Sequence, residues 1–88
     1  MAWRISFTPQ AHKELNKLGA REAGRITEFL RERVAPSPRA LGGPLKGHLR
    51  EFWRWRLGDY RILARLEDDE LLVLVVRVGN RNKIYDKP

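Results

Sequence analysis

Three arginines are the side chains of this sequence best suited to chemistry. Arg54 and Arg56 are separated by one residue, so on a β-strand their guanidinium groups would project from the same face. Arg61 follows the pair Gly58-Asp59, which is typical of a tight turn and would place Arg61 beside Arg56 on the next strand. A guanidinium can donate two parallel hydrogen bonds to a phosphate. The spacing therefore predicts a cluster of cations that repel one another unless an anion such as a phosphodiester lies between them.

The charge of the chain is unevenly distributed. The 88 residues carry a net charge of +7. Residues 46–66 account for +4 and residues 77–88 for +3, whereas the rest of the chain sums to zero. Such clustering is typical of proteins that bind polyanions. A surface that served only solubility would scatter its basic residues.

The composition excludes several classes of protein. There is no cysteine, which removes disulfide frameworks, zinc–thiolate sites and thiol catalysis. The longest apolar run, residues 71–76, is far shorter than the roughly 20 residues of a membrane helix. The first residues do not resemble a signal sequence. We expect one cytoplasmic domain over residues 1–88, without a membrane partner.

The N-terminal half shows helical patterning after one short strand. Residues 2–7 alternate between apolar and polar side chains and predict a strand. Thr8 and Pro9 are typical of the start of a helix, which Gly19 would end. Apolar residues at helical spacing predict a second helix over residues 20–34.

The C-terminal half changes to a period of two. Residues 35–47 hold three prolines and three glycines and predict a loop. Three strands joined by short turns are expected at 49–57, 60–67 and 71–78. The order β-α-α-β-β-β predicts an α+β fold, with two N-terminal helices packed on one face of a small, mainly antiparallel four-stranded sheet. The arginines would emerge from the opposite face.

The aromatic residues divide between these two faces. Trp53 and Trp55 share a face with Leu49 and Leu57, so we expect both tryptophans in the core. Phe52 falls on the face of the arginines, where an aromatic ring could stack on a nucleic-acid base.

The sequence offers weaker candidates for acid–base chemistry. His12 and His48 invite comparison with ribonucleases, but nothing in the pattern places them together. Tyr85 lies between Lys83 and Lys87, cations that favour the phenolate form.

Five segments, taken in order, resemble the RelE/ParE superfamily of toxins from type II toxin–antitoxin systems, on the RelE-like side. They are residues 43–47, 53–57, 58–62, 76–81 and Tyr85. The resemblance implies an mRNA interferase that cuts messenger RNA in the ribosomal A site, contacts 16S rRNA there, and is held inactive by a cognate RelB-like antitoxin. It also implies attack of a 2′-hydroxyl on the adjacent phosphate, with no metal or organic cofactor.

The resemblance implies catalytic roles for Arg54, Arg56, Arg61, Arg81 and Tyr85. Arg61 and Arg81 suit stabilisation of the phosphate, Tyr85 is the candidate base, and Arg56 is assigned to the leaving group. Well-known members carry lysines where this chain has Arg54 and Arg56. A guanidinium does not readily lose its proton, so electrostatics would carry more of the catalysis here.

Five further residues are expected to contact RNA. They are Lys46, Arg50, Phe52, Arg65 and Lys83.

Two other functions stay open on the sequence. One is a ParE-like inhibitor of DNA gyrase that cleaves no RNA. The other is a non-catalytic RNA-binding module, for which Phe52 and the arginines would suffice. Retention of the whole arginine and tyrosine set argues against the first, because a gyrase inhibitor does not need it.

Overall fold

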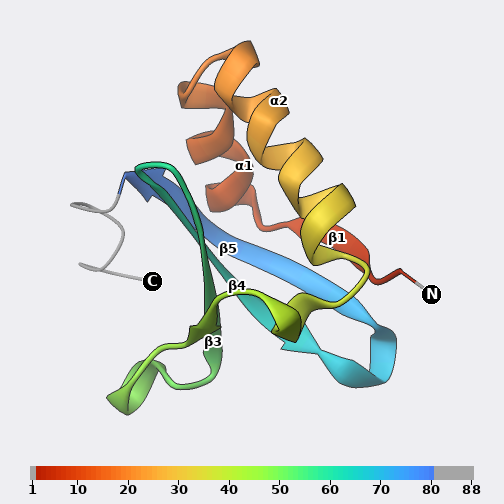
Figure 1. Cartoon of the computed structure of the whole chain (residues 1–88). Helices are drawn as coiled ribbons and strands as arrows, with labels where there is room; N and C mark the ends of the chain where they lie inside the picture. The colour runs from red at the N-terminus through yellow and green to blue at the C-terminus, as the bar shows by residue number, and fades with distance from the viewer. Residues whose placement is uncertain (1, 81–88) are drawn as a thin grey trace.

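The computed structural model describes residues 2–80, which form two α-helices and five strands (Figure 1). The helices are α1 (Pro9–Lys17) and α2 (Ala20–Phe29). The strands are β1 (Arg4–Phe7), β2 (Gly43–Pro44), β3 (Phe52–Leu57), β4 (Tyr60–Glu67) and β5 (Leu72–Asn80).

The sheet has the order β1-β5-β4-β3-β2. β1 pairs parallel with β5, and the other three pairings are antiparallel. The prediction of a mainly antiparallel sheet beneath two helices is therefore confirmed, but the prediction of four strands is wrong. The fifth strand, β2, is only Gly43 and Pro44, inside the predicted loop. A two-residue strand of glycine and proline shows no alternation that sequence reasoning could detect.

Both helices cover the same face of the sheet (Figure 1). Thr8 caps α1, with its Oγ1 accepting a hydrogen bond from the Ala11 N–H at 3.1 Å, and Pro9 occupies the first turn. α2 continues through a π-helical turn over Leu30–Val34, so the predicted end at residue 34 is confirmed. The π-helical turn leaves Leu30 and Val34 both fully buried.

The main core lies between the helices and the sheet. Trp55 is its largest fully buried side chain, and its Nε1 donates to the Pro38 carbonyl oxygen at 3.1 Å. Trp53 packs against the same core, so the prediction for both tryptophans is confirmed. The prediction for Leu49 is wrong. β3 begins at Phe52, and Leu49 belongs to a short 3₁₀ turn that packs on the opposite face of the sheet.

An exposed ion pair fastens the loop before β2 to the turn between β4 and β5. Arg39 donates through Nη1 to Asp68 Oδ1 at 2.7 Å and through Nη2 to Oδ2 at 3.0 Å. The same guanidinium lies 5.8 Å from the ring centroid of Trp53. The hydrogen bond from Arg39 lowers the pKa of Asp68, and the same bond raises the pKa of Arg39.

Replacing Asp68 with asparagine is expected to lower the melting temperature at neutral pH and to have no effect in strong acid. Because the pKa of Asp68 is lowered on folding, its contribution is complete above the ordinary aspartate pKa of about 3.9 and is lost as the pH falls through the folded value. Thermal unfolding of both proteins between pH 2 and pH 7 measures this. A deficit in the Asp68→Asn variant that persists unchanged at pH 2 would contradict it.

Candidate functional site

Four arginine side chains lie on the face of the β3–β4 hairpin opposite the helices. We call this surface the arginine face, and it comprises Arg54, Arg56, Arg61 and Arg65. Arg56 and Arg61 are direct partners in the β3–β4 register, as the turn at Gly58 predicted. Gly58 has a positive φ of 59°, which suits the first position of a two-residue hairpin loop and fixes that register. The prediction that these two cations lie side by side is therefore confirmed.

Arg61 is held by its own turn. Only 9% of the residue is exposed, and its Nη1 donates to the carbonyl oxygens of Gly58 at 3.1 Å and Tyr60 at 3.0 Å. Neither acceptor is charged, so the guanidinium is oriented without being neutralised. Among residues 2–80, no buried side-chain nitrogen lacks a hydrogen-bond partner. Arg61 is therefore a largely buried positive charge that is held in place by its own turn.

The remaining members of the arginine face differ in their surroundings. Arg56 is exposed, and within residues 2–80 no carboxylate lies within 4.0 Å of it or of Arg61. Arg54 is half-buried. Arg65 is exposed and pairs with Glu67 at 3.4 Å from Nε to Oε1. The uncompensated positive charge thus concentrates at Arg56 and Arg61, toward the hairpin turn.

Phe52 lies on this face as predicted, but it is not an unpartnered aromatic. It packs with Leu49 and Val76 around the buried pair Leu45 and Leu63. This second apolar cluster packs on the same face of the sheet as the arginines. Phe52 stays only half-buried, so part of the ring still borders solvent.

The other predicted RNA contacts lie near the start of β3 or outside the described residues. Lys46 and Arg50 are exposed on either side of the 3₁₀ turn that precedes β3. Arg50 is not on the strand, where the sequence had placed it, because the strand begins two residues later. Arg81, Lys83 and Tyr85 fall outside the described residues.

Arg77 was counted with the basic C-terminal segment, and the structure corrects its role. Its Nε donates to Glu14 Oε2 on α1 at 2.9 Å, and the side chain is only 13% exposed. Arg77 is therefore neutralised by the chain itself and adds no free charge to the arginine face.

A pocket of about 480 Å³ opens beside the edge of the sheet. It is lined by apolar and glycine residues together with three arginines: Phe29, Arg33, Leu41, Gly42, Gly43, Arg54, Trp55 and Arg56. Gly42, at a φ of 71°, closes one wall so tightly that a β-carbon there would collide with the Arg54 carbonyl oxygen. Sequence reasoning missed Arg33, because it lies in the half of the chain whose charges cancel.

The edge of β3 beside the pocket is only partly paired with β2. The Leu45 N–H donates to the Phe52 carbonyl at 3.0 Å, so alternate residues of β3, starting with Phe52, direct their backbone groups toward β2. β2 pairs with β3 only as far as Arg54. Arg56 is next in the alternation, and no strand of the described part of the chain covers its N–H and C=O on that side.

The structure does not bring the two histidines together. His12 lies on α1, over the helical face, whereas His48 lies in the 3₁₀ turn that packs on the other face. Across residues 2–80, no group of three histidine, aspartate or glutamate side chains is placed to hold a metal ion. In that same range no helix is long and apolar enough to cross a membrane.

Comparison with known proteins gives consistent relatives. A toxin named RelG from Mycobacterium tuberculosis is 33% identical over 85 residues, covering 97% of this chain and 98% of that protein. The mRNA interferase toxin RelE of Escherichia coli is 31% identical, covering 94% of this chain and 87% of that protein.

Solved structures agree with the sequence comparison. The toxin–antitoxin complex RelBE2 of M. tuberculosis contains a chain that matches with a TM-score of 0.86 at 31% identity, covering 92% of this chain and 93% of that one. A mutant of the E. coli toxin RelE in its free state matches with a TM-score of 0.78 at 29% identity, covering 96% and 90%.

The family model for the ParE toxin of type II toxin–antitoxin systems matches residues 5–85, nearly the whole chain. The relatives named RelG and RelE place the same chain near the RelE branch. The chain therefore belongs to the RelE/ParE superfamily of type II toxins.

Proposed function

We propose that this toxin is an endoribonuclease that cleaves messenger RNA in the ribosomal A site. The observation that carries the proposal is the pair Arg56 and Arg61, side by side on one face with no carboxylate near either among residues 2–80. Repulsion between two such cations is relieved when a phosphodiester binds both. The similarity to an E. coli toxin named mRNA interferase supports the same function.

The reaction divides among the residues of this face and of the following segment. The 2′-hydroxyl loses a proton and attacks the adjacent phosphorus, and the bond from phosphorus to the 5′-oxygen breaks. The products are a 2′,3′-cyclic phosphate and a 5′-hydroxyl, whose oxygen takes up a proton from water. Charge accumulates on the non-bridging oxygens during attack, where Arg61 and Arg81 are assigned to stabilise it. Arg61 suits this role because the carbonyls of its turn already orient it, so little reorganisation accompanies the reaction.

Proton transfer is assigned to Tyr85 as the base for the 2′-hydroxyl. Arg56 is assigned to the departing 5′-oxygen, as a cation that stabilises developing negative charge. A guanidinium keeps its proton at neutral pH. Arg54 and Arg56 therefore act by stabilising negative charge, and most of the rate acceleration in this toxin comes from electrostatics.

Expression of the toxin in growing bacteria tests this function. We expect primer extension on a translated message to show prompt cuts at a fixed place within codons, and no cuts when the same message is not translated. Intact messages accompanied by a DNA-damage response would show a gyrase inhibitor instead. Normal growth with intact messages would leave only a non-catalytic RNA-binding module.

We further propose that an antitoxin with an acidic, extended segment inhibits this toxin by binding at the pocket beside β3. A structural relative is described as a complex of toxin and antitoxin. The pocket is lined by Phe29, Leu41 and Trp55 together with arginines, and within residues 2–80 the backbone of Arg56 offers an open strand edge. An extended segment can add to such an edge through backbone hydrogen bonds while its side chains fill the pocket.

Replacing Arg33 with glutamate should weaken the antitoxin without slowing cleavage. Arg33 lines the pocket but does not belong to the arginine face, so the substitution repels acidic residues of the partner only. We expect the dissociation constant of the toxin–antitoxin complex to rise about tenfold or more, measured by calorimetry. Arg21→Glu, on the exposed surface of α2, is the control. Equal affinities for the two variants would exclude the pocket as the docking site.

A further inference from the structure

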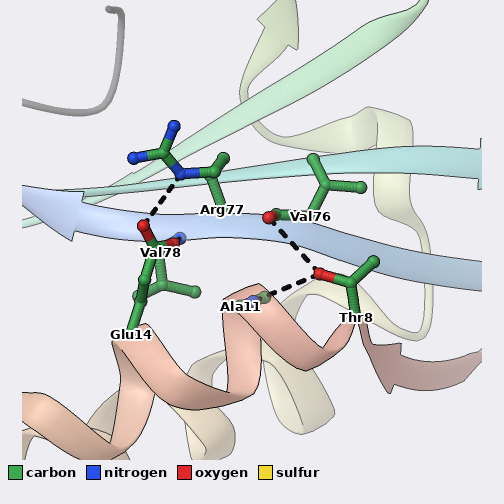
Figure 2. Close-up of polar contacts among 6 residues, drawn as sticks. All are labelled: Thr8, Ala11, Glu14, Val76, Arg77 and Val78. Carbon is green, nitrogen blue, oxygen red and sulfur yellow. Dashed lines mark hydrogen bonds and ion pairs between the residues drawn. The ribbon is translucent and has the colours of Figure 1, made fainter. Parts of the chain in front are cut away.

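Glu14 joins helix α1 to the end of strand β5 through two hydrogen bonds (Figure 2). Its Oε1 accepts from the Val78 N–H at 2.9 Å, and its Oε2 accepts from Arg77 Nε at 2.9 Å. The two side chains are largely shielded, at 21% exposed for Glu14 and 13% for Arg77. A carboxylate with both oxygens engaged on one strand end is a fixed connection and not a surface ion pair.

The position of Glu14 follows from where β1 ends. β1 pairs with β5 only as far as Phe7 opposite Val75. Beyond Val75, no described strand lies on that side of β5, so the Val78 N–H would have no backbone partner. Glu14 supplies the missing acceptor from the helix. Just before the helix, Thr8 supplies a donor instead, with its N–H donating to the Val75 carbonyl oxygen at 2.9 Å.

The connection is made at a bend in the strand. The β4–β5 register shifts between Leu63 and Ala64, which leaves Val76 as an extra residue of β5. A bulge of this kind redirects the strand beyond it. Thr8 Oγ1, at the start of α1, donates to the Val76 carbonyl oxygen at 3.4 Å. Thr8 therefore contacts the bulge, and Glu14, further along α1, contacts the end of the strand (Figure 2).

Glu14 also controls the charge of the arginine face. Arg77 pairs in register with Leu63, whose side chain lies on that face. Its guanidinium lies on the side of β5 away from α1, and the Glu14 side chain reaches from the helix to the strand to bind it (Figure 2). Without Glu14, a largely shielded cation would be left unpaired close to Arg61 and its neighbours.

We propose that Glu14 is a positioning residue for RNA cleavage, and this inference rests on the function proposed above. The strand that Glu14 fixes continues through Gly79 and Asn80 directly to Arg81, and Tyr85 follows four residues later. Glu14 thereby holds the end of the strand that directly precedes, in the sequence, the groups assigned to phosphate stabilisation and proton removal. In-line attack is sensitive to such placement, and an error of about 1 Å can cost about 10²-fold in rate.

Single-turnover cleavage of a ribosome-bound message tests this role. For Glu14→Ala we expect the cleavage rate constant to fall about 10²-fold, with ribosome affinity within about twofold of the unaltered toxin. Glu14→Gln is isosteric and keeps an acceptor for the Val78 N–H, so we expect a fall of about tenfold and a folded protein. Glu22→Ala is the matched control, because Glu22 pairs with Arg25 at the same distance of 2.9 Å but on α2. That control should cleave normally.

A charge swap separates positioning from simple charge pairing. Glu14→Arg combined with Arg77→Glu restores an ion pair, but an arginine cannot accept from the Val78 N–H. We expect the swapped protein to cleave as slowly as Glu14→Ala, and the Val78 amide to exchange with solvent at least about tenfold faster in both. Normal cleavage by the swapped protein, or by folded Glu14→Gln, would overturn the positioning role. Failure of the unaltered toxin to cleave would overturn the proposed function first, and the positioning role with it.

Discussion

Replacing Arg61 with alanine is expected to lower the rate of message cleavage by about 10²- to 10³-fold. The Arg61 guanidinium is oriented by hydrogen bonds to two backbone carbonyl oxygens of its own turn, those of Gly58 and Tyr60. In the proposed reaction, its removal takes away a preorganised charge from the place where the phosphate gains negative charge. The same loss is expected for Arg81→Ala. Single-turnover cleavage on purified ribosomes measures both.

The control for Arg61 separates lost chemistry from lost structure. Arg61→Lys keeps the charge and can bond one carbonyl, but it lacks the planar fork, so we expect intermediate activity. Arg21→Ala, on the exposed surface of α2, removes one charge far from the arginine face and should leave cleavage unchanged. A folded Arg61→Ala protein that cleaves at the normal rate would show that Arg61 has no part in the reaction.

Replacing Trp55 with alanine should have the largest effect on stability, about 3–5 kcal/mol. Trp55 is fully buried beneath the helices, and its loss leaves a cavity together with an unsatisfied carbonyl at Pro38. A domain of this size has only about 5–15 kcal/mol of stability, so much of the protein would unfold. Urea denaturation at neutral pH measures the change.

Two comparisons show which part of Trp55 matters. Trp55→Phe keeps most of the apolar volume but loses the Nε1 donor, and we expect it to cost about 1–3 kcal/mol. Trp3→Ala removes a tryptophan that is only partly buried at the edge of the core, and it should cost less than Trp55→Ala. If the two alanine variants were equally stable, the main core would not be centred on Trp55.

The hairpin could be predicted because its signals are local. Alternation places Arg54 and Arg56 on one face, and a two-residue turn fixes the register between β3 and β4. That register brings Arg56 opposite Arg61, which is the main feature of the candidate site. The capped start of α1 at Thr8 is local in the same sense.

What the sequence missed depends on contacts between distant residues. Arg77 pairs with Glu14, which lies 63 positions earlier, so a count of charge along the chain treated Arg77 as free. Arg33 reaches the edge of β3 only because α2 folds over the sheet. Arg61 donates to the carbonyls of its own turn, an arrangement that alternation does not reveal. The pairing of Gly43 with Arg54 could not be predicted, because Gly43 and Pro44 show no alternation of apolar and polar side chains.

The most direct test of RNA cleavage by 2′-hydroxyl attack uses one altered nucleotide. A message bound to purified ribosomes is prepared with a single 2′-deoxy sugar on the 5′ side of the mapped cut. We expect the toxin to cut the ordinary message to a 2′,3′-cyclic phosphate and to leave the deoxy message intact at that position. Cleavage of the deoxy message at the same position and rate would contradict it.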